Sequence, residues 1–114
     1  MMTDYFDPFG ELRETLDRHE EAIKDFRKNG KAFSLAKRDY RIALQQKMTE
    51  LRFDKSYPVT LVPDLARGDE HVAQLGYERD YLHAEFEADR SLLEYLKNKT
   101  WILQRQHEME MKGR

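Results

Sequence analysis

The first half of the chain has an apolar pattern with alternating spacings of three and four residues, the period of a helix packed lengthwise on another helix. One set of seam positions contains Leu16, Ile23, Gly30, Lys37, Leu44 and Leu51. The other set contains Leu12, His19, Phe26, Phe33, Tyr40 and Lys47. The pattern predicts a helix over about residues 8–53, started by the Asp7-Pro8 pair. Because the phase continues past Asn29-Gly30, we expect one helix, softened or kinked at Gly30; a break into two helices is the alternative.

The second half of the chain carries two apolar stripes over about residues 69–111, which predicts a second long helix. Its seam is formed by Val72, Leu75, Arg79, Leu82, Phe86, Asp89, Leu93, Leu96, Thr100, Leu103 and His107. The other stripe includes Tyr77, Tyr81, Leu92, Tyr95 and Ile102. The two stripes lie about 120–140° apart at 100° per residue. One partner helix covers one stripe, so the second stripe predicts a further partner.

Residues 54–68 separate the two helices and contain Pro58 and Pro63, which disfavour helix at the preceding residues. One interpretation is that Leu61 and Leu65 pack on the helix ends, while Gly68 takes a conformation that alanine resists. The other is a docking site for a partner, made by Leu61, Leu65 and Arg67.

These elements predict an all-α fold: a long antiparallel two-helix hairpin, resembling a coiled coil, in a single domain over residues 1–114. A lone hairpin of this size buries little surface. We therefore expect it to self-associate into a helical bundle, with a homodimer of four helices favoured. The interface residues would be those of the second stripe: Tyr77, Tyr81, Leu92, Tyr95 and Ile102.

The composition narrows the class of protein. The chain has no cysteine, which excludes disulfides and thiolate metal sites. No apolar run approaches the length of a membrane span, and the N-terminus lacks the pattern of a signal peptide. We expect a cytoplasmic protein that does not contact a membrane.

Charge is unevenly distributed: residues 26–55 carry nine basic and three acidic side chains, although the whole chain has a net charge of −2. Five basic residues share a narrow arc of the first helix: Lys24, Arg27, Lys31, Arg38 and Arg41. Such a stripe can follow a phosphate backbone. The favoured alternative is that it pairs with Glu78, Glu85 or Asp89 of a neighbouring helix.

No catalytic or metal-binding pattern is present. The four histidines, His19, His71, His83 and His107, lack the spacing of a helical metal site. No phosphate-binding glycine loop and no nucleophile motif occurs. We expect a protein that is not an enzyme and that binds no cofactor or metal.

The loop carries a resemblance to a known group of proteins. The segment Pro58–Ala73 reads PVTLVPDLARGDEHVA, with YRIAL at Tyr40–Leu44 and ELR at Glu50–Arg52. In these motifs the chain resembles small, largely uncharacterised helical proteins encoded by phages and prophages of Gram-positive bacteria. The resemblance covers about residues 40–109 and implies a phage accessory protein. It brings no known catalytic residue.

Two functions follow as hypotheses from these patterns. The first is a non-enzymatic interaction protein, an adaptor or an inhibitor of a host factor, built as an oligomeric hairpin. The second is a nucleic-acid-binding accessory protein of phage replication or recombination, which would use the basic stripe of the first helix.

Overall fold

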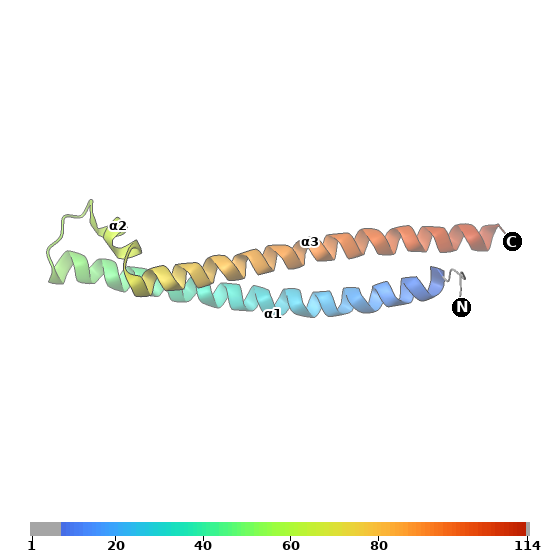
Figure 1. Ribbon diagram of the computed structural model, residues 1–114, viewed down its shortest axis with the longest axis horizontal. Helices are drawn as coiled ribbons and strands as arrows, with labels where there is room; N and C mark the ends of the chain where they lie inside the picture. Colours follow the sequence, from blue (N-terminus) through green and yellow to red (C-terminus); the bar gives the residue numbers. More distant parts are fainter. Residues whose placement is uncertain (1–7, 114) are drawn as a thin grey trace. The chain divides into compact units, whose positions relative to one another are not determined.

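The computed structural model describes residues 8–113 and is all-α, with no strand among them. Its elements are α1 (Pro8–Thr49), the π-helical turn η1 (Glu50–Asp54), α2 (Val62–Arg67) and α3 (Glu70–Lys112). Figure 1 shows α1 and α3 running side by side in opposite directions. The predicted antiparallel two-helix hairpin is confirmed.

The hairpin consists of two packing units. Unit 1 combines the residues up to Arg27 with those from Glu87 onward, and unit 2 is Lys28–Phe86. Each unit therefore contains one segment of α1 and one segment of α3. Unit 2 also contains η1 and α2.

The small side chains of α1 are the most deeply buried, which the apolar pattern did not predict. Thr15, Ala22 and Ala43 are all buried, and they belong to one heptad position. Small side chains at one repeated position let two helices approach closely. The seam is consequently rotated from its predicted line. Leu16 is 44% exposed, and Lys37 is exposed as well.

The predicted seam of α3 is confirmed. Val72, Leu96 and Leu103 are buried, and the other predicted seam residues are half-buried. The seam of α3 matches its prediction because large apolar residues such as Leu96 and Leu103 occupy its buried positions.

Gly30 lies inside a continuous α1, so the alternative of a break there is wrong. A Cβ atom at this position would lie 2.9 Å from Cε1 of Phe86. The reciprocal arrangement occurs at Gly76 of α3, where a Cβ atom would lie 3.2 Å from Cε2 of Tyr40. Each helix of unit 2 thus uses a glycine to admit an aromatic ring from the other helix.

The end of α1 is a π-helical turn in which the Lys55 amide donates to the carbonyl of Glu50 (3.2 Å). Ser56 follows in the left-handed region, with φ of 59°. The Tyr57 amide then donates to the carbonyl of Leu51 (3.0 Å) and closes the helix end. A left-handed residue after a helix is usually glycine. Here a serine takes this position.

The expectation that Leu61 and Leu65 pack on the helix ends is wrong, because both are exposed. The residues one position later, Val62 and Ala66, are buried against Leu51 instead. The reason is that α2 begins at Val62, and its helical period turns Val62 and Ala66 to the same side.

Gly68 also differs from the prediction. Its φ of −83° and ψ of −7° are open to any residue, and an added Cβ would lie 3.5 Å from the nearest atom, an ordinary contact. Alanine is therefore compatible with this position. The chain restarts at Asp69, whose carboxylate accepts a hydrogen bond from the Val72 amide (3.2 Å) and caps α3.

Candidate functional site

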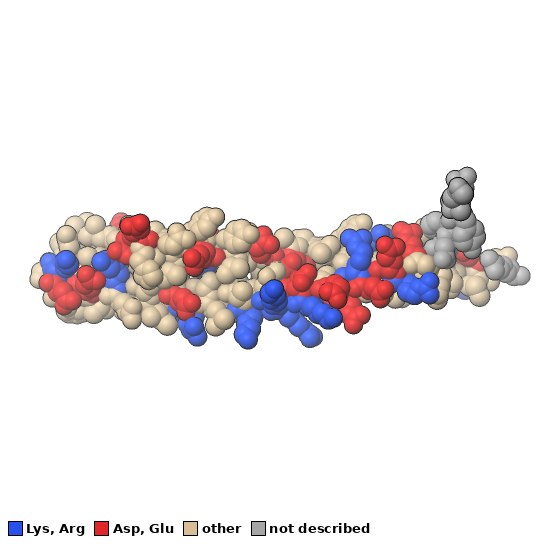
Figure 2. All heavy atoms as spheres, turned by 60° about the horizontal axis from the view of Figure 1, so that its bottom comes forward, with Lys and Arg blue, Asp and Glu red and all other residues tan. Residues whose placement is uncertain are grey.

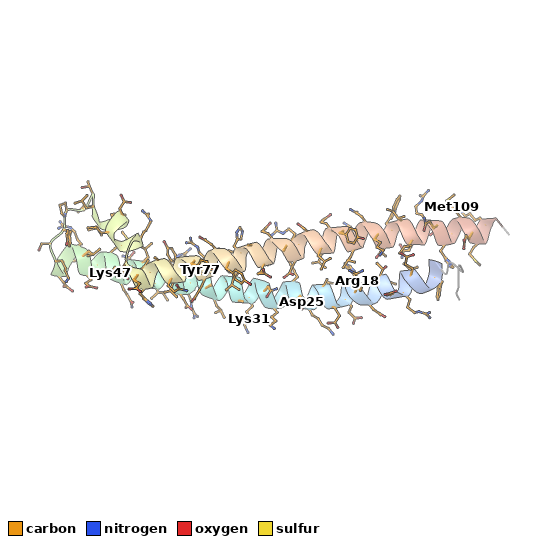
Figure 3. All side chains as sticks on the ribbon, in the orientation of Figure 1. Arg18, Asp25, Lys31, Lys47, Tyr77 and Met109 are labelled. Carbon is orange, nitrogen blue, oxygen red and sulfur yellow. The ribbon has the colours of Figure 1, made fainter. Side chains whose placement is uncertain are left out.

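The α3 stripe, defined as Tyr77, Tyr81, Leu92, Tyr95 and Ile102, is exposed throughout. Exposure ranges from 39% at Leu92 to 65% at Tyr77. Met109, on the same side of the helix by spacing, is also exposed, and Figure 3 labels it near the end of α3. All of these side chains remain available for a partner.

Within unit 1, the α3 stripe borders a shallow cavity of about 470 Å³ between the helices. Tyr95 and Ile102 line it together with Lys99, whose ammonium lies 3.8 Å from the carboxylate of Glu11 on α1. An apolar surface edged by a partly exposed ion pair has the composition of a protein-binding surface.

The basic stripe of α1, defined as Lys24, Arg27, Lys31, Arg38 and Arg41, is exposed at every position. Figure 2 shows Lys and Arg side chains projecting from one face of the molecule, and in Figure 3 Lys31 extends from α1 on the side away from α3.

Two residues of the stripe form ion pairs within α1. Lys24 pairs with Glu21 (3.4 Å) and Arg38 with Asp39 (3.0 Å), so both stripe residues with a partner use an acid of their own helix. Among the residues that the structure describes, no ion pair joins this stripe to Glu78 or Glu85. Pairing with the acids of a second chain stays a prediction.

The predicted loop docking residues lie on a larger exposed apolar surface. Leu61 and Leu65 are exposed, and so are three residues that the sequence analysis did not select: Phe53, Tyr57 and Val59. Arg67 is held by Asp64 (3.4 Å) on the same short helix. Of these side chains, Phe53 and Val59 line a cavity of about 230 Å³, together with Val62 and Pro63 at the start of α2.

A half-buried charge cluster fixes the start of α3 to the end of α1. The ammonium of Lys47 lies 3.4 Å from the carboxylates of both Glu50 and Asp69. The amide of Val72, followed by the Lys47 ammonium, lowers the pKa of Asp69, although desolvation opposes this shift. Desolvation acts to lower the pKa of Lys47, but its two carboxylate partners raise it overall.

The histidines are not gathered into a metal site. Among the described residues, no group of three His, Asp or Glu side chains could hold a metal ion. His107 instead packs against Phe9, with ring centroids 5.5 Å apart, and His83 packs against Phe33, at 4.9 Å. Each of these two rings therefore contacts an aromatic side chain of the other helix.

Sequence reasoning missed the features that depend on local backbone geometry. Ser56 and η1 gave no signal, because neither a serine nor the ELRFD segment is distinctive for its conformation. Phe53 belongs to neither heptad set and lies next to the loop, and these two facts are the signal in the sequence for its exposure.

Comparison with known proteins finds no matching family, no matching curated protein and no matching solved structure. The likeness of Pro58–Ala73 to phage proteins stays a prediction. No helix among the described residues is sufficiently long and apolar to span a membrane.

Proposed function

We propose that this protein is a non-enzymatic interaction module that self-associates through the α3 stripe. The observation that carries the proposal is the continuous exposure of five large apolar side chains on one side of α3: Tyr77, Tyr81, Leu92, Tyr95 and Ile102. Exposed apolar side chains are common singly, whereas an aligned set of them is typical of an interface.

Small residues on the same side of α3 fit this mode of pairing. Ala84 and Ala88 are exposed and lie between the tyrosine pair and Leu92 along the stripe. If two α3 helices pair antiparallel about Ala88, Ala84 faces Leu92 of the second copy and Tyr81 faces its Tyr95. Large side chains then meet small ones near the centre, which is how helices interdigitate.

The test is the molar mass in solution, measured by light scattering at micromolar concentration. We expect a dimer, and we expect Tyr81→Glu or Leu92→Glu to shift it towards monomer, because a buried carboxylate without a partner is costly. Leu35→Glu is the matched control, since Leu35 is equally exposed but lies on α1 outside the stripe. A monomeric parent chain would overturn the proposal.

A second candidate function is nucleic-acid binding, favoured by the basic stripe of α1. In the chain itself these cations are not neutralised by Glu78 or Glu85 of α3. If the stripe contacts phosphates, affinity should fall with salt, with a log–log slope of about −0.7 to −0.9 per phosphate. Changing Arg38 and Arg41 to Gln should weaken binding equally for all sequences. Absence of salt-dependent binding would remove this candidate.

Beyond self-association, the proposed partner of the interaction module is a protein of the bacterial host. Affinity capture from host lysate, compared with and without nuclease, separates the two functions. A protein retained after nuclease treatment supports an adaptor or inhibitor. Capture that nuclease abolishes supports the second candidate.

A further inference from the structure

A groove in unit 2 combines cations with aromatic rings. It has a volume of about 420 Å³ and is lined on the α1 side by Phe33, Lys37, Tyr40 and Arg41 and on the α3 side by Arg79 and His83. Three of these side chains, Lys37, Arg41 and Arg79, are cationic at neutral pH. The one carboxylate that lines the groove, Asp80, is already engaged by Arg79, at 2.9 Å.

Arg79 is held in place before any ligand arrives. Its guanidinium lies over the ring of Tyr40, 4.2 Å from the centroid, and its Nε donates to Asp80 (3.0 Å). Tyr40 is itself fixed, because its ring edge rests on Gly76 of α3. A planar guanidinium fixed in this way suits a phosphate, which it can bind through two hydrogen bonds.

The α1 side of the groove contributes two cations, Lys37 and Arg41, which have different surroundings. The ammonium of Lys37 lies 5.4 Å from the centroid of the Phe33 ring, a cation–π contact. Arg41 is exposed and belongs to the basic stripe of α1. The groove therefore opens beside the side chains that would follow a phosphate backbone.

We propose that this groove binds a segment of single-stranded nucleic acid, with phosphates on Lys37, Arg41 and Arg79 and a base against the aromatic floor. The inference deepens the second candidate function and rests on it. A single strand is favoured over a duplex because only unpaired bases can reach an apolar floor. An acidic peptide would satisfy the cations but would place no planar base against the aromatic lining of the groove.

The test measures binding of a fluorescent twenty-residue oligo-dT to the full chain by anisotropy, at several salt concentrations. The double change Lys37→Gln with Arg41→Gln should lower affinity at least tenfold. Because two phosphate contacts are lost, the log–log salt slope should become shallower by about 1.4. The matched control is Arg13→Gln with Arg18→Gln, which removes the same charge from exposed positions of α1 outside both the groove and the basic stripe and should change affinity less than twofold.

Arg79→Lys provides a second variant, which keeps the charge but loses the fixed planar donor. We expect a threefold to tenfold loss of affinity for oligo-dT. Circular dichroism melting of every variant checks the fold. A fall in melting temperature without a change in affinity would assign Arg79 a purely structural role and would overturn its part in the groove.

The outcomes distinguish failure of the groove proposal from failure of nucleic-acid binding, the function on which the proposal rests. If both double variants weaken binding equally, binding follows the net charge of α1 and the groove proposal is overturned. If the unmodified chain binds no oligo-dT, the groove proposal and the second candidate function are both overturned. Tighter binding of the matching duplex, or displacement of oligo-dT by poly-glutamate at equal charge, would also overturn the groove as a single-strand site.

Discussion

The two packing units fill the space between α1 and α3 with different side chains. In unit 1 the buried residues are aliphatic or small, with Leu12, Thr15 and Ala22 from α1 and Leu96 and Leu103 from α3. The buried residues of unit 2 are also aliphatic or small, but half-buried aromatic rings pack beside them, and two of these rings enter notches left by glycines of the opposite helix. The same pair of helices is thus packed by two methods.

The difference concerns how strictly each unit sets the register of the helices. A ring that enters a glycine notch can occupy only one position along the helix. If the two helices shifted by one residue, the ring would clash with a Cβ atom. Aliphatic side chains are more tolerant, since many arrangements fill similar volume. We infer that unit 2 fixes the register of α1 against α3, and that unit 1 contributes burial with less positional restriction.

The largest expected effect is in unit 1. Leu96→Ala should lower the free energy of unfolding by about 3 kcal/mol, because Leu96 is 1% exposed and its removal leaves a cavity. Urea unfolding followed by circular dichroism measures the loss. Leu35→Ala is the control, with an expected loss below about 1 kcal/mol on exposed surface. Equal losses would mean that unit 1 has no distinct core.

The second prediction concerns the glycine notch of unit 2. Gly30→Ala should lower the free energy of unfolding by about 1 kcal/mol, because overpacking against Phe86 outweighs the gain in helix propensity. In a Phe86→Leu background the same change should be neutral or stabilising. The double-mutant cycle should show a coupling of about 1 kcal/mol or more. Additive effects would contradict the notch.

The third prediction returns to unit 1, where the hydroxyl of Thr100 is buried without a hydrogen-bond partner. Thr100→Val keeps the side-chain shape and removes the unsatisfied group, so it should raise the free energy of unfolding by about 1 kcal/mol. Thr49→Val is the control, since the Thr49 hydroxyl donates to the carbonyl of Gln45 (2.9 Å) and its loss should bring no gain. Destabilisation by Thr100→Val would show that the hydroxyl is used.

The smallest effect is expected at the charge cluster of unit 2. Because the pKa of Asp69 is lowered in the folded chain, its stabilisation is present above the ordinary aspartate pKa near 4 and is lost as pH falls through the lower folded value. Asp69→Asn should therefore flatten the fall in melting temperature between pH 5 and pH 2. The pKa of Lys47 is raised in the folded chain, so the pH dependence of its stabilisation is opposite to that of Asp69. The stabilisation by Lys47 is lost only as pH rises into strongly alkaline solution.

Glu11→Gln is the control for this pH dependence, because it removes the longer ion pair to Lys99 in unit 1. It should alter the acid melting curve less than Asp69→Asn does. A larger effect of Glu11→Gln would show that unit 1, rather than unit 2, depends on its ion pair.

The sequence predicted the helical hairpin well because long heptad patterns and paired prolines are strong local signals. The α3 seam and the residues of the α3 stripe could be taken from helical spacing alone, whereas spacing placed the basic residues on one arc of α1 without showing whether they would be exposed. Spacing could not show that Leu61 and Leu65 would be exposed, because the start of α2 at Val62 decides which loop residues turn inward. Gly68 was misjudged for a similar reason: a glycine before a helix need not adopt a left-handed conformation.

What the sequence by itself determined is the set of helical faces, because each face follows from the period of 3.6 residues along one helix. What only the tertiary structure decided is which residues meet across the helices. Small residues such as Ala22 and Ala43 are buried more deeply than Leu16, since two helices approach most closely where side chains are smallest. The pairing of Gly30 with Phe86 and of Gly76 with Tyr40 also depends on register, which is a property of two helices together and is written in neither one alone.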